Sequence, residues 1–375
     1  MASKNRARIQ DIIGLVNAIS PPALAEEWDN VGLQVGDPSA EVSRIAIALD
    51  PTADSVEEAI AQGAELLICH HPLLFKPLRQ VTPNDETGRL VTRAISAQLA
   101  ICAVHTNLDR ANGGLNDWLA ERLGLLRVEP LEEPQGLLFK LAVFVPSEHQ
   151  EQVAEALFEA GAGQIGAYDR CSFRIAGTGT FRPGDGTEPF IGTRGQDEAV
   201  AETRLETVVA KEKLGRVVAR MLKAHPYEEV AYDLYPLINS RGDVGLGRIG
   251  RLPAPVAFAD FAEQVKGTLG ADHVRLVGKP DRSISKIAVC GGSGASLLAA
   301  AARKGADVLV TGDVKYHDAR IAESQDLCLV DAGHFATERI MIDALAGRLR
   351  SMIEEKGFET EVLPLTCEQD PFSIL

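Results

Sequence analysis

Apolar residues along the first part of the chain follow two spacings, which predict strands and helices in alternation. Residues 44–49 (RIAIAL) and 66–69 (LLIC) are short continuous apolar runs, which are typical of buried strands. Residues 54–62 between them have helical spacing, and Gly63 is the residue expected just past the helix. The order strand, helix, strand predicts a parallel βαβ unit with a right-handed crossover.

The alternation extends on both sides of this unit. A helical spacing of apolar residues predicts a helix over residues 8–20, which a pair of prolines ends. Further on, residues 87–99 predict a helix, residues 101–104 a strand and residues 114–123 another helix. The first third of the chain is therefore predicted to form a mainly parallel α/β sheet.

Part of this pattern returns later in the chain. Shifted by 242 residues without a gap, residues 44–68 lie over residues 286–310, so that RIAIALD falls on KIAVCGG and GAELLI on GADVLV. Chance similarity is an alternative, because βαβ units share apolar strands and a glycine after the helix. The gapless run favours duplication, with two halves related by a pseudo-two-fold axis.

A segment with a different order of elements separates the two halves. Residues 137–237 predict strand, helix, strand, strand, helix and strand, which is the ferredoxin-like split βαβ motif. We therefore predict an α/β fold in which two pseudo-symmetric halves, residues 1–135 and 246–375, form one discontinuous metal-binding domain. Residues 136–245 are predicted to form an inserted ferredoxin-like α+β domain.

Composition narrows the class of protein. The 375 residues are 45% hydrophobic and 24% charged, as in ordinary globular proteins. No apolar run approaches the ~20 residues of a membrane span, and the N-terminus lacks a signal-peptide core. The six cysteines are scattered without a CxxC pair, which favours reduced thiols and a cytoplasmic location. A net charge of −15 without a basic block argues against a nucleic-acid partner.

Two adjacent histidines stand at the end of a predicted strand. Residues 65–75 read ELLICHHPLLF, and both rings of His70 and His71 can turn toward one crevice where the chain leaves the sheet. A pair of ordinary loop histidines is the alternative. Three further polar clusters weigh against that alternative: HTNLD at 105–109, GDVKYHD at 312–318 and HFATE at 334–338.

These clusters supply a set of candidate metal ligands if the two halves face one another: His70, His71, Asp109, His334 and Glu338. His334 and Glu338 share one face of a helix, because they are four residues apart. Imidazole and carboxylate without thiolate suit zinc, iron, manganese or cobalt with open positions. Five ligands exceed the needs of one tetrahedral ion. We therefore predict two divalent ions ~3.5–4 Å apart, bridged by Glu338 and each bound by one of the paired histidines.

Other residues are candidates for roles around this site. His105 is expected to act as a general acid–base or to orient a ligand, in preference to binding metal itself. Tyr316 and His317 are candidates for the far wall of the cleft. Asp29 is another candidate lining residue, with a solvated loop as the equal alternative.

Other chemistries lack their motifs. No GxSxG elbow occurs on a strand–helix turn, which argues against a serine hydrolase. GDVKYHD has the Gly-Asp of metallophosphoesterases, but no GNH(D/E) motif follows. His149 and His225 in the predicted insert have no partner ligands and are expected to be structural, and His273 is expected to be incidental.

The motifs, taken in order, resemble a known family. EEWDNVGLQVG, HHPLLF, HTNLD, GDVKYHD and GHFATE are similar to the motifs of the NGG1-interacting-factor-3-like family, also labelled GTP cyclohydrolase 1 type 2 homologs, over nearly the whole chain. The insert, with AHPYEEVAYDLYPL, resembles the PII/CutA-like domain of its longer bacterial members. The resemblance implies a dinuclear metal site at the five candidate ligands, in a toroidal homohexamer.

Two hypotheses of function remain open, from different classes. The first is a metal-dependent hydrolase of GTP cyclohydrolase type 2, in which hydroxide attacks C8 of the guanine ring and His105 moves protons. Its substrate is a nucleotide or another small molecule. The second is a metal-binding regulatory or trafficking protein without turnover, in which the insert senses a signal. A metal-dependent phosphoesterase is a third possibility, which release of inorganic phosphate would reveal.

Overall fold

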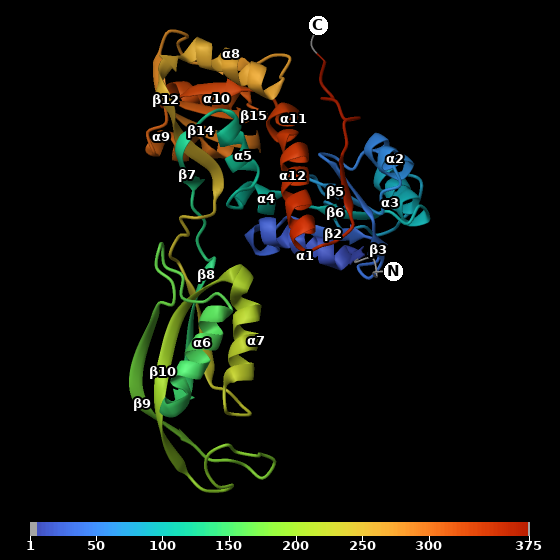
Figure 1. The fold of residues 1–375 in the computed structure, drawn as a ribbon. Helices are drawn as coiled ribbons and strands as arrows, with labels where there is room; N and C mark the ends of the chain where they lie inside the picture. The colour runs from blue at the N-terminus through green and yellow to red at the C-terminus, as the bar shows by residue number, and fades with distance from the viewer. Residues whose placement is uncertain (1–5, 374–375) are drawn as a thin grey trace. The chain divides into compact units, whose positions relative to one another are not determined.

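The computed structural model of the chain describes residues 6–373, and Figure 1 traces its fold. The chain divides into two compact units. Met1–Glu133 and Gly242–Leu375 form one, which we call the main unit, and Pro134–Arg241 form the other, which we call the insert unit. Helices accompany several sheets, so the predicted α/β class is confirmed.

The first sheet of the main unit has five strands in the order β17-β4-β5-β6-β2. Neighbours from β17 to β6 are parallel, whereas β2 is antiparallel to β6. Every residue of β5 and β6 is buried, which explains their continuous apolar sequences. The strands and their helices are β2 (Gly32–Val35), β4 (Arg44–Ala48), β5 (Leu66–Cys69), β6 (Ala100–Ala103), β17 (Glu361–Pro364), α1 (Ile9–Ile19), α2 (Ala53–Ala61) and α3 (Glu86–Ser96). Two further short strands of this part of the chain, β1 (Ala7–Arg8) and β3 (Glu41–Val42), pair with each other in antiparallel orientation.

The second sheet of the main unit has six strands in the order β13-β16-β15-β14-β12-β7. Its three middle strands β14, β15 and β16 are parallel, and the flanking pairs are antiparallel. The strands and their helices are β7 (Leu126–Glu132), β12 (Leu246–Ala257), β13 (Arg275–Val277), β14 (Ser283–Ser293), β15 (Val308–Gly312), β16 (Cys328–Asp331), α8 (Phe258–Leu269), α9 (Leu298–Arg303) and α10 (Tyr316–Ser324).

Helices α5 (Leu115–Arg122) and α12 (Ile340–Glu355) join the two sheets of the main unit (Figure 1). Helix α12 contacts β4 of the first sheet, and α5 contacts β14 of the second, while the two helices contact each other. A single hydrophobic cluster therefore includes Ile45 of the first sheet, Leu345 of α12 and Val289 of the second sheet. This shared core fixes the strand ends of the two sheets relative to one another.

The insert unit is an antiparallel sheet in the order β11-β8-β10-β9, with α6 and α7 packed on one face (Figure 1). Its elements follow the sequence order β8 (Leu138–Pro146), α6 (Gln150–Glu159), β9 (Ser172–Phe181), β10 (Glu198–Ala210), α7 (Leu214–Ala224) and β11 (Tyr232–Leu237). This is the order of elements predicted from the sequence. It has its own core, which includes Val143, Leu157, Leu205 and Met221.

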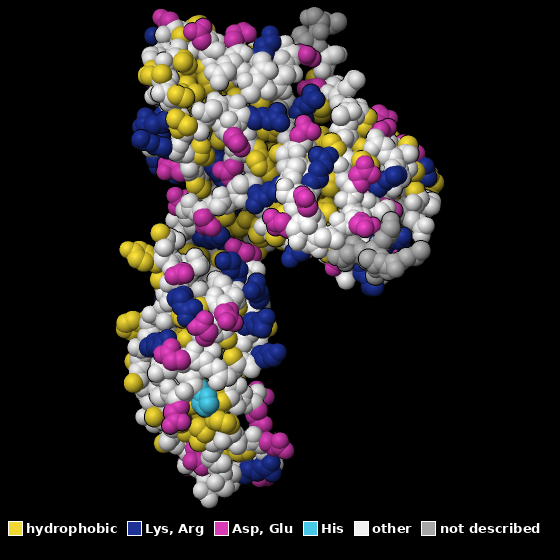
Figure 2. Space-filling model, in the orientation of Figure 1, with side chains coloured by type: hydrophobic (Ala, Val, Ile, Leu, Met, Phe, Trp, Pro, Cys, Tyr) yellow, Lys and Arg dark blue, Asp and Glu magenta, His cyan; other side chains and the backbone are white. Residues whose placement is uncertain are grey.

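The surface carries charges of both signs. Figure 2 shows Lys and Arg side chains interspersed with Asp and Glu over the face drawn. The six cysteines are free, and four of them are buried. Among residues 6–373, no helix combines the length and the apolar character needed to cross a membrane.

Candidate metal centre

The structure brings the five predicted ligands together in the main unit. His70 and His71 follow β5, and Asp109 lies in the short helix α4 (Thr106–Arg110) after β6. His334 begins α11 (His334–Glu338), the short helix after β16, and Glu338 ends it. Every one of these residues therefore follows the carboxyl end of a parallel strand, where open α/β sheets bind ligands.

The Glu338 carboxylate lies between the histidines. Its Oε1 is 3.6 Å from His70 Nε2, and its Oε2 is 3.2 Å from His71 Nε2 and 3.0 Å from His334 Nε2. Asp109 Oδ1 also lies 3.6 Å from His70 Nε2. Glu338 is only 4% exposed, so its negative charge acts within a poorly hydrated cluster.

Outer hydrogen bonds fix which nitrogen each histidine turns inward. Each of three rings uses Nδ1 to donate a hydrogen bond away from the cluster: His70 to the Val104 carbonyl at 2.8 Å, His71 to Asp50 Oδ1 at 2.7 Å and His334 to Asp313 Oδ2 at 2.7 Å. Nε2 then faces the cluster with its lone pair. A carboxylate or carbonyl behind the ring is the usual support of a metal-binding histidine.

Several inward atoms have no hydrogen-bond partner although they are buried. They are His70 Nε2, Asp109 Oδ1 and Glu338 Oε2. In addition, the Nε2 atoms of His71 and His334 lie 3.3 Å apart. Unpaired polar atoms are costly to bury, and converging lone pairs repel one another. The donor set therefore fits divalent cations, which would satisfy all of these atoms together.

The pKa values in the cluster show a local field that favours positive charge. For His71, burial opposes the charged form, but the hydrogen bond to Asp50 and the adjacent Glu338 carboxylate outweigh it and raise the pKa to about 10. The adjacent Glu338 carboxylate raises the pKa of His334 to about 9. Burial raises the pKa of the Asp109 carboxyl to about 6. The buried carboxylate of Glu338 thus attracts protons or other cations to the ring nitrogens.

His105 stands beside this cluster and is held by Asp29. Its Nδ1 donates a hydrogen bond to Asp29 Oδ1 at 2.9 Å. Burial opposes the charge of Asp29, but the bonds from His105 and Thr106 outweigh it and lower the Asp29 pKa to about 2. One ring nitrogen from each of His70, His71 and His105 lies within 4.8 Å of the others. The Asp29 side chain is fully buried, so the alternative of a solvated loop is wrong for this residue.

Three aromatic side chains lie elsewhere than expected. Tyr316 and His317 are exposed on α10, and neither is among the residues that line the pocket beside the cluster. The expectation that they form its far wall is wrong. That pocket has a volume of about 720 Å³, and His273, expected to be incidental, lines it together with Arg275 and Phe335.

Sequence reasoning missed the residues that support the ligands from behind. Asp50 follows β4 and holds His71. Gly292 has a positive φ of 59°, and a methyl group at its Cα would collide with the Glu338 carboxylate. In the repeat, Asp50 aligns with Gly292, so the sequence indicated that both residues follow equivalent strands. Their roles were not visible, because each depends on a side chain from a distant part of the chain.

Comparisons with known proteins find similar chains over nearly the full length. The family model for Duf34/NIF3 (NGG1p interacting factor 3) matches residues 7–371. Proteins named "GTP cyclohydrolase 1 type 2 homolog" are 45% identical in Halalkalibacterium halodurans and 43% identical in Bacillus subtilis, each over 98% of both chains. A crystal structure of a Bacillus cereus protein related to NIF3 superimposes with a TM-score of 0.85 at 42% identity, covering 100% of both chains.

Proposed function

The chain belongs to the Duf34/NIF3 family, and we propose that it is a metal-dependent hydrolase whose centre holds two divalent ions. The proposed ligands are His70, His71, Asp109, His334 and Glu338. The observation that carries the proposal is the set of buried inward atoms without hydrogen bonds, which belong to His70, Asp109 and Glu338. Zinc, iron, manganese and cobalt all suit this set of nitrogen and oxygen donors.

The position of Glu338 supports two ions in preference to one. Its two oxygens face different histidines, His70 on one side and the pair His71 and His334 on the other. A carboxylate in that position would hold both ions, each of which would also take one of the adjacent histidines. Asp109 would add a ligand beside His70, and His334 would add one beside His71.

The chemistry we propose is hydrolysis of a purine ring in a nucleotide. Bound divalent ions lower the pKa of water and polarise a carbonyl, imine or phosphoryl oxygen. His105 is the proposed general acid–base, because Asp29 holds its Nδ1 proton and leaves Nε2 to accept and return another. The buried carboxylate of Asp29 stabilises the imidazolium formed on the way. The name shared by the Halalkalibacterium halodurans and Bacillus subtilis relatives supports GTP as the first substrate to test.

The pocket beside the cluster supports a small-molecule substrate. Its volume of about 720 Å³ lies in the usual range for such sites. His71 and His334 line it, and Phe335 contributes an aromatic face. Arg275 also lines it, with its guanidinium paired with Asp331. The aromatic face suits a substrate with a flat ring.

We also propose the architecture that the family resemblance implies. The matching strand orders β4-β5-β6 and β14-β15-β16, each parallel, support duplication of two pseudo-symmetric halves. The βαββαβ order of the insert unit supports a PII/CutA-like domain. Six free cysteines support a reducing, cytoplasmic environment. A homohexamer is the assembly we expect, and the molar mass in solution tests it.

Metal content of the purified protein is the first test. We expect close to two divalent ions per chain, and a sharp fall in Glu338→Ala, which removes the central carboxylate. Glu354→Ala, at an exposed position of α12, is the matched control and is expected to keep its metal. Metal-free wild-type protein under metal-replete conditions would contradict the proposal.

Turnover by metal-loaded protein separates the hydrolase from the alternatives. We expect the wild-type protein to open the ring of GTP or a related nucleotide. We expect His105→Ala to lose this activity while its metal content stays intact. Release of inorganic phosphate would indicate a phosphoesterase instead. Absence of turnover with any nucleotide would favour a regulatory or trafficking protein, for which the metal centre serves binding alone.

A further inference from the structure

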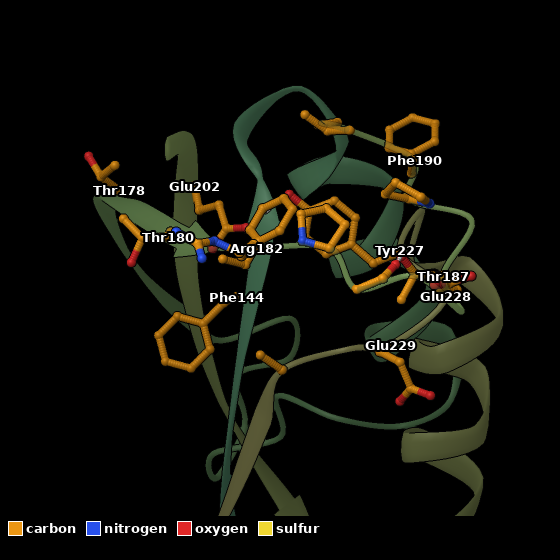
Figure 3. Close-up of a pocket in the computed structure, with 17 residues that line it drawn as sticks. Phe144, Thr178, Thr180, Arg182, Thr187, Phe190, Glu202, Tyr227, Glu228 and Glu229 are labelled. Carbon is orange, nitrogen blue, oxygen red and sulfur yellow. Dashed lines mark hydrogen bonds between the residues drawn. The ribbon is translucent and has the colours of Figure 1, made fainter. Parts of the chain in front are cut away.

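The insert unit contains a pocket of about 500 Å³, well away in sequence from the metal ligands (Figure 3). The ends of β9 and β10 form one side, and the loop that follows β9 and the segment that precedes β11 form the other. The volume suits a small organic molecule. Its lining residues include four aromatic rings: Phe144, Phe181, Phe190 and Tyr227.

The aromatic rings stand at angles around Tyr227. The centroids of Phe181 and Tyr227 are 5.9 Å apart with an edge-to-face angle of 62°, and those of Phe190 and Tyr227 are 6.5 Å apart. Figure 3 shows Phe144 and Phe190 on opposite sides of the pocket, with Tyr227 between them. Rings arranged in this way offer π-faces to a ligand from more than one direction.

A buried carboxylate is the main polar group of this pocket. Glu202 of β10 is 8% exposed, and its Oε1 accepts a hydrogen bond from the Tyr227 hydroxyl at 3.0 Å. Among residues 6–373, no Lys, Arg or His forms an ion pair with it. Arg182 lines the pocket, but its guanidinium is bound to both oxygens of Asp197, at 2.7 and 2.6 Å. The negative charge of Glu202 is therefore not neutralised by the protein.

The surrounding chain holds this carboxylate in place. Gly179 of β9 lies directly against it, and a methyl group at that Cα would collide with both carboxylate oxygens. Tyr227 is positioned by His225, whose Nδ1 accepts a hydrogen bond from the Tyr227 backbone at 3.1 Å. The Nε2 of His225 donates in turn to the Phe144 carbonyl at 3.0 Å. Three elements thus cooperate to present one carboxylate to an aromatic pocket.

We propose that this pocket binds a small organic cation that carries N–H donors, such as a primary ammonium, amidine or guanidinium group, on a flat or apolar body. A buried carboxylate without a cationic partner is costly, and a cationic ligand removes that cost. The Arg204 guanidinium already lies over Phe144, 5.4 Å from the centroid of that ring, so it is the faces of Phe190 and Tyr227 that attract a cation further. Glu228 and Glu229, which also line the pocket, add negative charge at its edge. An N–H donor is required because Glu202 has free lone pairs after its bond to Tyr227.

Benzamidine is the probe, because it is a flat amidinium of the right size. Its neutral isostere benzamide and its anionic relative benzoate share the ring but not the charge, and tetramethylammonium has the charge without N–H donors. Binding of each to the full-length, metal-loaded protein is measured by isothermal titration calorimetry and ligand-observed NMR. We expect saturable binding of benzamidine, about tenfold weaker or undetectable binding of benzamide, and none of benzoate.

Three variants locate the site. Glu202→Gln keeps an acceptor for Tyr227 but removes the charge, and is expected to weaken benzamidine binding by about tenfold or more. Gly179→Ala is expected to do the same by displacing the carboxylate, because its backbone has no positive φ to strain. The control is Glu155→Gln, the same substitution in α6 of the insert unit, where Glu155 pairs with Arg170 outside the pocket. It is expected to bind benzamidine as wild type does.

The outcomes that overturn the proposal are distinct. Equal binding of benzamidine, benzamide and benzoate would indicate an apolar pocket without a role for charge. Binding of benzamidine that survives Glu202→Gln would place it elsewhere, and absence of binding by any probe at millimolar concentration would remove the site. Metal content is measured in every variant and is expected to stay unchanged, so that failure here is separate from failure of the proposed metal centre.

Discussion

The role of each of these histidines depends on the hydrogen-bond partners of its ring nitrogens. His70, His71 and His334 each donate from Nδ1 to a fixed acceptor, which commits Nε2 to the cluster. His225 is held in the same way, but both of its nitrogens are used by the backbone of the insert unit. The same side chain is therefore a ligand candidate in one place and a structural support in another.

The pH response of His225 follows from this arrangement. Burial lowers its pKa below the ordinary value of 6.5, because the charged ring would lose its solvation and its Nδ1 could no longer accept from Tyr227. A lowered pKa means that the unfolded chain binds the proton more tightly. The stabilisation from neutral His225 is complete above pH ~6.5 and is lost as the pH falls through the folded-state pKa. NMR titration of the full chain, with His225→Gln for assignment, should give a midpoint below 6.5. A midpoint at or above this value would contradict the expectation.

Individual ligand candidates were predictable because their residue types stand out at strand ends. His70 and His71 follow a fully buried strand, and His334 and Glu338 are spaced for one helix face. Their supports were harder to recognise. Asp50 is one of many acids near a strand end, and only the folded chain shows that it meets a ring 21 residues later. Tyr316 and His317 were wrongly predicted to line the cleft. They follow a strand, but they begin the exposed helix α10.

Among the elements, β12 is held to the helices of the main unit by a buried ion pair. Arg248 of β12 is 2% exposed, and its Nε and Nη2 donate to the two oxygens of Asp117 in α5 at 2.7 and 2.8 Å. It also donates to three backbone carbonyls, those of Gly245, Gly247 and Ala111. One guanidinium thereby satisfies acceptors from a strand, a helix and a loop.

Arg248→Met is expected to destabilise the main unit strongly. It fills similar space but leaves Asp117 and the three carbonyls without their donor, and breaking a buried pair in this way costs about 3 kcal/mol or more. The measurement is the free energy of unfolding of the main unit from denaturant titration of the full protein. Arg251→Met, at an exposed position of the same strand, is the control and should change it by less than about 0.5 kcal/mol. Equal effects of the two substitutions would contradict the expectation.

Elements with strong local signals were predicted closely, and those shaped by distant contacts were not. The helix expected over residues 8–20 is α1 (Ile9–Ile19), and the strand expected over residues 66–69 is β5. In contrast, β7 and most of β12 escaped notice. Strand β7 begins with exposed residues, and β12 contains two prolines and a shift of register against β14, so neither shows a clean alternation. Their strand character depends on pairing with each other.

For the molecule as a whole, the pairing of β7 with β12 explains how the chain accommodates an insert unit. Leu246 pairs with Glu132, so the strand that enters the insert unit and the strand that leaves it are neighbours. The insert unit has a separate hydrophobic core. For the main unit, the insertion is equivalent to a long hairpin loop between β7 and β12. The entropy cost of closing a loop rises only slowly with its length, so the insertion destabilises the main unit little.

Removal of the insert unit is expected to leave the main unit intact. A chain that lacks residues 134–241 and joins β7 to β12 through a short glycine-rich turn should unfold cooperatively and retain its divalent metal, because no proposed ligand lies in the deleted segment. Circular dichroism during thermal unfolding and metal analysis test this. Loss of both cooperativity and metal would show that the main unit depends on the insert unit for folding.

The order in which the ligand candidates are synthesised has a consequence in the cell. A nascent chain that has emerged from the ribosome through Asp109 carries His70, His71 and Asp109, but it lacks His334 and Glu338 until residue 338 has been translated. Because Glu338 lies between the histidines, a chain that stops before residue 338 lacks the carboxylate that the proposed pair of cations would share. Uptake of the proposed ions is therefore expected only after residue 338 has been made, and shorter fragments are expected to leave the metal supply untouched.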